Sequence, residues 1–299
     1  MDNKIVSNTQ IKFDIIHARK AIPSRPARSC KGDFGRVLCV CGSNGMAGAA
    51  FLCAKAAYRS GAGLVEIFTH ECNRAIIQTL LPEAIVSVYD DSYTQDTLIP
   101  SLEKADCVIV GCGLGVTALS RKILSGILHS INTTKKSLVL DADALNLISR
   151  NPSLIKYAKG AIITPHAKEM ERLCGKTVED ILESTADTAY GFAKKHSLIC
   201  VLKDHETVIS DGQRIYKNTS GNSGMATGGS GDVLAGIVGG LLAQRNNSVA
   251  DCFDTVALAV YLHGYSGNIA AQRLTEYCLT ASDIIEYLPD AFSEMLKSR

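Results

Sequence analysis

The sequence lacks an excess of charge of either sign. Its 299 residues include 31 lysines and arginines and 30 aspartates and glutamates, which give a formal net charge of +1. A molecule with so small a charge has no overall field that draws it to nucleic acid or to an anionic membrane. We therefore expect neither kind of partner, and any anion site must be built locally.

Long apolar runs are also missing. No stretch reaches the roughly 20 apolar residues that a membrane-spanning helix needs. The first residues, from Met1 to Lys4, do not begin the apolar core of a signal peptide. The expectation that follows is a cytoplasmic protein.

No CxxC pair occurs, although the chain has 11 cysteines. The cysteines are scattered through apolar stretches, as in the segment from Val37 to Cys41. Free cysteine is among the most buried residue types. We therefore expect buried thiols rather than disulfides, metal ligands or redox pairs.

What the sequence does contain is a large apolar fraction, 46% of residues, together with 25 glycines. This composition is typical of a chain that buries a sizeable core and turns often. Residues 1–30 lack a clear period and carry Pro23 and Pro26, so we expect an irregular or single-helix N-terminal extension. Residues 31–299 are expected to form one large domain.

From Val37 onwards, short β-branched runs alternate with helical patterns, which indicates an α/β fold with a mainly parallel sheet covered by helices on both faces. The expected strands are Val37 to Cys41, Leu64 to Phe68, Ala84 to Val88, Cys107 to Val110, Ser137 to Leu140, Ala161 to Thr164 and Ile199 to Leu202. Thr207 to Ser210 and Arg214 to Lys217 predict an antiparallel hairpin at the end of the sheet. Buried helices are expected over Asp232 to Leu242 and Val256 to Tyr265.

A glycine-rich loop precedes the first of these helices. Gly229, Ser230 and Gly231 stand where backbone N–H groups have no intrahelical partners, so they predict an anion hole that could hold a phosphate. Asp232 follows in the first helical turn, where its carboxylate could accept a proton. The simpler interpretation is that Ser230 or Asp232 only caps the helix.

Further polar and glycine-rich motifs follow other predicted strands. Ligands of open α/β sheets bind outside the carboxyl ends of the strands, so these motifs indicate one binding edge. Asp141 and Asp143 could hold Mg²⁺ through water or cap a helix, His166 could touch a substrate, and Lys203 offers a cation to a phosphate. The motifs are Gly42 to Ala50, Gly111 to Gly115, Asp141 to Asn146, Thr164 to Glu169 and Lys203 to Thr207.

Six motifs in one order make the chain resemble the ADP-dependent NAD(P)H-hydrate dehydratases. This family has a ribokinase-like fold and is similar to the C-terminal domain of bifunctional NAD(P)H-hydrate repair enzymes. The resemblance extends over nearly the whole chain. The motifs are Lys31-Gly32-Asp33-Phe34-Gly35, Gly45-Met46-Ala47-Gly48-Ala49, Arg59-Ser60-Gly61-Ala62-Gly63-Leu64, Asp141 to Asn146, Thr164-Pro165-His166, and Gly224-Met225-Ala226-Thr227 before the Gly-Ser-Gly-Asp sequence.

The resemblance implies a hydro-lyase that repairs hydrated nicotinamide cofactors. It would convert the S-form of NADHX or NADPHX to NADH or NADPH at the expense of ADP, releasing AMP and phosphate, with Mg²⁺ expected beside the nucleotide. Asp232 would be the catalytic base. The hydrate would lie near Ala47, Gly113, His166 and Asp232. The nucleotide would lie near Lys203, Asp204, His205, Glu206, Thr207 and Gly231.

The family loop usually has threonine where this chain has Ser230, a change that keeps the hydroxyl. The resemblance further implies a homotetramer and a functional partnership with a separate NAD(P)H-hydrate epimerase. One alternative is an ATP-dependent kinase of a vitamin or sugar, which the same fold supports with Asp232 as base. Another is a nucleotide-binding subunit without activity.

Overall fold

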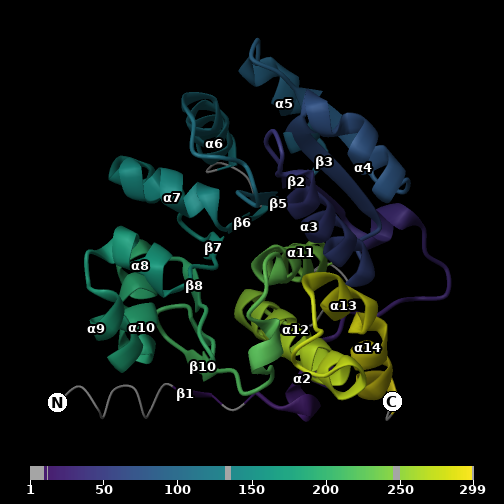
Figure 1. Cartoon of the computed structure of the whole chain (residues 1–299), viewed down its shortest axis with the longest axis vertical. Helices are drawn as coiled ribbons and strands as arrows, with labels where there is room; N and C mark the ends of the chain where they lie inside the picture. Colours follow the sequence, from purple (N-terminus) through teal and green to yellow (C-terminus); the bar gives the residue numbers. More distant parts are fainter. Residues whose placement is uncertain (1–9, 12, 132–135, 245–249, 298–299) are drawn as a thin grey trace.

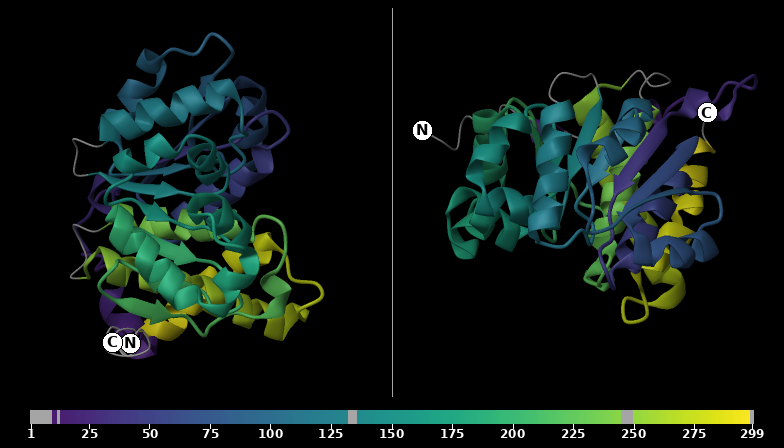
Figure 2. Two further views of the ribbon diagram at one scale, coloured as in Figure 1. Left: turned by 90° about the vertical axis from the view of Figure 1, so that its left-hand side faces the viewer. Right: turned by 90° about the horizontal axis from the view of Figure 1, so that it is seen from above.

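The computed structural model describes residues 10–11, 13–131, 136–244 and 250–297. Over these residues the chain forms one central sheet with helices on both of its faces (Figure 1). Figure 2 shows the same layers from two further directions. The α/β class predicted from the alternating pattern is therefore confirmed.

Ten strands of the described residues belong to this sheet, in the order β1-β10-β9-β8-β7-β6-β5-β2-β3-β4. The strands from β8 to β4 in this order are parallel, whereas β9 is antiparallel to both β8 and β10. They are β1 (Gln10–Ile11), β2 (Arg36–Val40), β3 (Leu64–His70), β4 (Ile85–Tyr89), β5 (Cys107–Val110), β6 (Ser137–Leu140), β7 (Ile162–Ile163), β8 (Ile199–Leu202), β9 (Val208–Ser210) and β10 (Ile215–Lys217).

All seven expected parallel strands and the hairpin are present, with ends within about two residues of the predicted positions. The strand that sequence patterns missed is β1, which pairs with β10 through Gln10 and Ile11 alone. Two residues are too few for an alternating pattern to show, so its place depends on the partner strand rather than on its own sequence.

Helices cover each face of the sheet because side chains along each strand alternate between two cores. Val37 and Cys39 of β2 belong to one core, and Leu38 and Val40 belong to the other. The first core is covered by α2 (Ile15–Ala21), α3 (Ala47–Arg59), α4 (Arg74–Leu80), α11 (Ser230–Ala243), α12 (Cys252–Leu274), α13 (Ala281–Glu286) and α14 (Leu288–Leu296). The second is covered by α5 (Gln95–Lys104), α6 (Ala118–Ile131), α7 (Asp143–Arg150), α8 (Ala167–Cys174), α9 (Val178–Glu183) and α10 (Thr185–His196).

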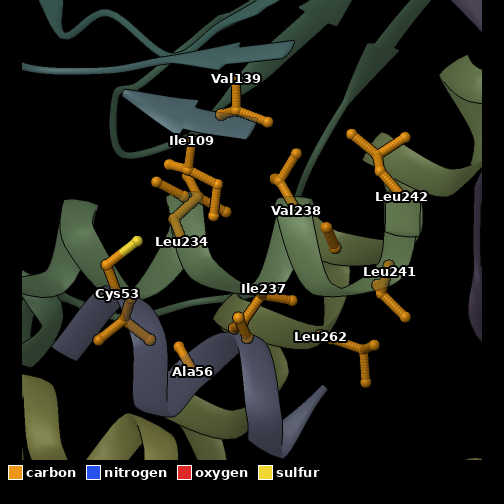
Figure 3. Close-up of a cluster of buried hydrophobic side chains, with 14 of the residues drawn as sticks. Cys53, Ala56, Ile109, Val139, Leu234, Ile237, Val238, Leu241, Leu242 and Leu262 are labelled. Atoms are coloured by element: carbon orange, nitrogen blue, oxygen red, sulfur yellow. The ribbon is translucent and has the colours of Figure 1, made fainter. Parts of the chain in front are cut away.

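Helix α11 is the most buried of these helices, and every residue from Val233 to Ala243 is buried. It lies between the sheet and α3, as Figure 3 shows for Leu234 and Val238 facing the strands and Ile237 facing α3. A Cβ atom at Gly236 would lie 2.2 Å from the backbone oxygen of Cys53. The absence of a side chain there lets the two helices pack closely, which fixes the start of α11 relative to the sheet.

Helix α12 is longer than the expected segment from Val256 to Tyr265, since it runs from Cys252 to Leu274. Its second half has few large apolar residues, so the sequence signal ends early. The helix continues because small residues there face a neighbour: a Cβ at Gly267 would lie 2.3 Å from the sulfur of Met225. No described helix is long and apolar enough to cross a membrane.

The N-terminal segment packs on the first core as far as the structure describes it, and residues 1–9 and 12 of the expected extension lie outside the described residues. Asp14 caps α2 by accepting hydrogen bonds from the N–H groups of Ile16 and His17. Ala18 and Ala21 of α2 are buried against the same core as α12 and α14. Four 3₁₀ turns complete the described structure: Lys31–Phe34, Glu71–Asn73, Pro152–Tyr157 and Ser223–Met225.

Candidate active site

The loops that follow the parallel strands meet along one edge of the sheet. β2 and β5 are neighbours, although β3 and β4 follow β2 in the chain, so the strand order reverses between them. Such a reversal opens a crevice at the carboxyl ends of the strands. Here the N–H of Ser43, after β2, donates to the carbonyl of Gly113, after β5, over 2.6 Å.

The N-terminus of α11 faces this edge. Its N-cap residue is Gly229, which adopts a left-handed conformation with φ of 92° and has no side chain to occupy the first N–H groups. The macrodipole places a partial positive charge at this end of the helix, and an anion is therefore stabilised here. The helix begins at Ser230, so neither Ser230 nor Asp232 is its cap and the simpler interpretation of the loop is wrong.

Asp232 stands in the first turn of α11 beside a second carboxylate. Its oxygen, an oxygen of Asp141 and the sulfur of Cys112 all lie within 4.8 Å of one another. Burial, reinforced by the charge of Asp141, raises the pKa of Asp232 to about 6, although a hydrogen bond from Cys112 and the charge of Lys203 oppose this. A carboxylate with this pKa is ionised at neutral pH and is a stronger base than an ordinary aspartate.

Lys203, at the end of β8, pairs with Asp141, at the end of β6. Its Nζ donates to Oδ1 of Asp141 over 2.8 Å, and the hydroxyl of Thr164 donates to the same oxygen over 2.7 Å. Burial alone would lower the pKa of Lys203, but the charges of Asp141 and Glu169 raise it above its ordinary value. Lys203 is therefore a fixed cation at the carboxyl edge of the sheet.

Asp141 begins a tight turn with a strained second residue. Ala142 has φ of 47° and ψ of −114°, and the N–H of Ala144 donates to the carbonyl of Asp141 over 3.0 Å. These angles fit the second position of a type II′ turn, where glycine is preferred. Ala142 is also the N-cap of α7, so the expectation that Asp141 or Asp143 caps this helix is wrong. The turn holds Asp141 at the edge at the cost of backbone strain.

Replacing Ala142 with glycine should therefore stabilise the protein. We expect the free energy of unfolding to rise by about 1 kcal/mol, because glycine adopts a positive φ without a clash of its Cβ. Denaturant unfolding of Ala142→Gly and Ala142→Val would measure the effect, with the β-branched variant expected to be less stable than the wild type. Equal midpoints for all three proteins would show that the turn carries no strain.

His166 begins α8 and has a structural role as well as a place at the edge. The Nδ1 of its ring accepts a hydrogen bond from the backbone N–H of Glu169 over 3.3 Å. The backbone N–H of His166 in turn donates to Oε2 of Glu169 over 2.9 Å. Burial and the charges of Lys203 and Arg172 lower the pKa of His166. The neutral ring accepts at Nδ1, so Nε2 carries the proton, and it lies 3.5 Å from Oε1 of Glu169.

A pocket of about 970 Å³ opens at this edge. The predicted site residues that line it are His166, Lys203, Asp204, His205, Thr207, Gly229, Ser230, Gly231 and Asp232. The predicted residues that do not line it are Ala47, Gly113 and Glu206. Glu206 forms an ion pair of 2.5 Å with Lys217, on the surface. The pocket therefore unites most of the expected nucleotide segment with the expected base.

Comparisons with known proteins identify the family of this chain. A model of the NAD(P)H-hydrate dehydratase family matches residues 37–290. The ADP-dependent (S)-NAD(P)H-hydrate dehydratase of Enterococcus faecalis is 34% identical over 270 residues, which cover 90% of this chain and 88% of that protein. The chain belongs to the NAD(P)H-hydrate dehydratase family.

Two solved structures allow the fold of this family member to be compared as well. A ribokinase-like superfamily protein from Enterococcus faecalis superposes with a TM-score of 0.84 at 31% identity, covering 96% of each chain. The ADP/ATP-dependent NAD(P)H-hydrate dehydratase of Bacillus subtilis, co-crystallised with ATP and Mg²⁺, has a TM-score of 0.80 at 28% identity, covering 94% of this chain and 97% of the other. The ribokinase-like fold is confirmed.

Ala47 and Gly113, which the family resemblance assigns to the hydrate, lie together on the β2 and β5 side of the edge. A Cβ at Gly113 would lie 2.9 Å from the Cβ atoms of Met46 and Ala49, which flank Ala47 in the chain. Gly113 directly follows Cys112, whose sulfur lies close to Asp232. Gly113 is thus linked to Asp232 through Cys112, although neither Ala47 nor Gly113 lines the pocket.

His263 of α12 is a lining residue that our sequence interpretation of this family member did not include. Its Nε2 lies 3.0 Å from the carbonyl oxygen of Ser230, to which it donates. Burial lowers the pKa of His263 to about 4, so the ring is neutral. A histidine within an otherwise apolar helix was the one available signal. Asn218, Ser220 and Glu169 also line the pocket without a predicted role.

Proposed function

We propose that this protein removes water from the S-form of hydrated NADH or NADPH and uses ADP to do so, releasing AMP and phosphate. The observation that carries the proposal is the carboxylate of Asp232, with a pKa of about 6, at the N-terminus of α11 in a pocket that Lys203 also lines. A base beside an anion-binding helix end is the arrangement that phosphoryl transfer to a hydroxyl requires.

In the proposed reaction Asp232 accepts the proton of the hydroxyl on C6 of the hydrate. The hydroxyl oxygen forms a bond to the β-phosphorus of ADP while the bond to the AMP oxygen breaks, so AMP leaves. Phosphate then departs from C6 with the C–O electron pair, driven by the lone pair of the ring nitrogen, and loss of a proton from C5 restores the dihydropyridine. The N–H of Gly231 would stabilise charge on the transferring phosphoryl group, whereas the N–H of Ser230 already donates to the carbonyl of Thr227 over 3.4 Å.

We propose that Mg²⁺ accompanies the nucleotide. Asp141 suits this role because it lines the pocket and Lys203 and Thr164 both bind Oδ1, so that Oδ2, which lies 3.9 Å from the sulfur of Cys112, could face a hydrated ion. Asp143 does not line the pocket, and its Oδ2 accepts a hydrogen bond from the N–H of Gly115 over 2.8 Å. The ion would neutralise charge on the phosphates.

The experiment that tests the function is incubation of the purified protein with NADHX and either ADP or ATP. Recovery of dihydronicotinamide absorbance together with AMP and inorganic phosphate supports the proposal. A stable phosphorylated product formed with ATP would instead identify a kinase. Binding of nucleotide without turnover of either donor would identify a subunit without activity.

The pH dependence of this reaction should follow Asp232. Because burial raises its pKa to about 6, the basic form is present above that pH and is lost as the pH falls through it. We expect kcat/KM, which reports the free enzyme, to decrease about tenfold for each pH unit below this value. Initial rates measured on both sides of pH 6 would show the decrease. If kcat/KM instead stays constant down to the ordinary pKa of an aspartate, burial does not raise the pKa of the catalytic base.

The relative from Enterococcus faecalis is named for the S-form of the hydrate. If this chain shares that stereospecificity, the other epimer needs a separate NAD(P)H-hydrate epimerase, which we propose as its functional partner in the cytoplasm. We also propose a homotetramer. Ile76, Leu80 and Ile85 support a contact between subunits because all three are exposed apolar residues on α4 and the edge strand β4. Light scattering would measure the oligomeric state.

A further inference from the structure

Four thiols lie buried together, and one of them, Cys112, lies beside the candidate base. The side chains of Cys39, Cys41, Cys53 and Cys112 are all 0% exposed. The sulfur atoms of Cys41, Cys53 and Cys112 lie within 4.8 Å of one another, and the sulfur of Cys39 lies 3.9 Å from that of Cys53. We call Cys41, Cys53 and Cys112 the thiol triad.

The topology brings the triad together from three separate segments. Cys41 follows β2, Cys112 follows β5, and these strands are neighbours where the strand order reverses. The N–H of Gly42 donates to the carbonyl of Cys112 over 2.9 Å, which joins the two strand ends. Cys53 comes from α3, and Figure 3 shows its sulfur on the side of the helix that faces the strands. The position of the triad is therefore fixed by the sheet and by α3.

The spacing of the triad suits a thiophilic ion. Zinc binds thiolate sulfur at about 2.3 Å in tetrahedral sites, which places the ligand sulfurs about 3.8 Å apart. The three sulfurs are already within 4.8 Å of one another, so a shift of about 1 Å or less would close the site. Soft thiolate ligands favour ions such as Zn²⁺ and Cd²⁺ over Mg²⁺. Packing of an apolar core does not require three sulfur atoms at this spacing.

One member of the triad lies beside two carboxylates of the pocket. Cys112 belongs to a second cluster, with Asp141 and Asp232, whose ligand atoms lie within 4.8 Å of one another. Both carboxylates line the pocket, and the sulfur of Cys112 lies 3.9 Å from Oδ2 of Asp141. Lys203 neutralises one of the two carboxylates, the other leaves a negative charge that favours a cation, and Cys112 offers a sulfur ligand beside them.

We propose that Cys41, Cys53 and Cys112 form a buried binding site for a divalent thiophilic ion of the zinc group, and that the ion inhibits the enzyme through Asp232. The inhibition rests on the proposed function, whereas binding does not. The carboxylates of Asp141 and Asp232 lie within 4.8 Å of the sulfur of Cys112 but form a cluster separate from Cys41 and Cys53, so an oxygen of Asp232 would have to shift toward Cys112 to complete the tetrahedral set. An oxygen of Asp232 that ligates an ion cannot accept the proton of a hydroxyl, so turnover stops.

Binding must displace thiol protons, which gives the site a characteristic pH dependence. Burial raises the pKa of Cys41, and hydrogen bonds between the thiols raise those of Cys53 and Cys112. The free thiols are therefore protonated at neutral pH, and the ion replaces their protons as it binds. The affinity is expected to rise with pH, in contrast to a site made of ionised carboxylates alone.

The test is a titration of the full chain with Cd²⁺, followed by the ultraviolet charge-transfer absorbance of cadmium thiolates. The exposed Cys30, Cys72 and Cys278 are first replaced by serine, because accessible thiols would also bind the ion. We expect one ion per chain, with a cadmium NMR shift typical of three sulfur ligands. Cys53→Ala should weaken binding by about 10²-fold or more. The matched control is Cys200→Ala, a buried cysteine of β8 outside the triad, which should bind as the parent does.

Three results would overturn the site: no charge-transfer band, a band that Cys53→Ala leaves unchanged, or a cadmium shift typical of oxygen ligands. If Cys53→Ala fails to fold, the NMR shift of the parent protein decides the question alone. Turnover measured at each point of the titration tests the inhibition separately. A bound ion that leaves turnover unchanged would overturn the inhibition while the site stands, and binding in a protein without turnover would count against the proposed function alone.

Discussion

Replacing Asp232 with asparagine is expected to lower kcat by about 10² or more while leaving binding of the hydrate nearly unchanged. The amide has almost the same shape as the carboxylate, but it cannot accept the hydroxyl proton. Asp232 also stands beside the N–H groups at the start of α11, so the phosphoryl group would still bind. Rates at saturating NADHX and ADP, together with calorimetric titration of the hydrate, would separate the two effects.

The same variant should be more stable than the wild type, which distinguishes lost chemistry from lost structure. The folded protein raises the pKa of Asp232 from 3.8 to about 6, so the native state binds a proton more tightly than the unfolded chain does. The stability that this proton contributes is lost as the pH rises through about 6, and asparagine avoids that loss. At neutral pH we expect Asp232→Asn to gain up to about 3 kcal/mol in free energy of unfolding.

Denaturant unfolding of both proteins from about pH 7 down to the unfolded pKa of 3.8 would show whether the difference disappears in acid. An unchanged rate for Asp232→Asn would remove Asp232 from the mechanism. A variant that is both inactive and less stable would indicate that Asp232 stabilises the fold. The raised pKa of Asp232 predicts the opposite. Ser230→Ala is the matched control in the same turn, since it changes a neighbouring side chain without removing the base.

The sequence predicts most of this fold because the strands are buried on both faces. Cys107 to Val110 and Ile199 to Leu202 are short apolar runs bounded by polar residues, and both strands have the predicted ends. What the sequence does not contain is the partner of a strand: β1 has two residues, and its place depends on its pairing with β10. Similarly, the second half of α12 is helical because Gly267 faces Met225, a contact between distant segments.

The site divides in the same way. Glycine-rich loops and polar residues after strands predict an edge where Gly113, Asp141 and Lys203 meet, because parallel strands all end on one side. His263 was missed because nothing near it in the chain points to Ser230, which lies 33 residues away. The strain at Ala142 and the proximity of Cys112 to Asp232 also depend on backbone angles and on three-dimensional packing, which no local pattern contains.

Replacing Lys203 with methionine is expected to cost about 3 kcal/mol in free energy of unfolding. Methionine keeps most of the apolar stem but removes the charge that pairs with Asp141, whose side chain is 2% exposed. A buried carboxylate without its cation is costly, and Asp232 and Glu169 close by add negative charge. Lys217→Met is the matched control: it pairs with Glu206 on the surface, where solvent screens the charges, so we expect a much smaller loss of stability.

A double-mutant cycle with Asp141→Asn decides whether the loss comes from the pair or from Lys203 alone. If the unpaired charge is the cause, the variant with both changes should be more stable than Lys203→Met, and the coupling should be about 1 to 3 kcal/mol. The acid limb of the pH profile of kcat/KM supplies an independent measurement. Lys203 lowers the pKa of Asp232, so its removal should move that limb to higher pH. If the losses of stability from the two substitutions simply add, Lys203 does not neutralise Asp141. If the acid limb of kcat/KM does not move in Lys203→Met, Lys203 does not adjust the pKa of Asp232.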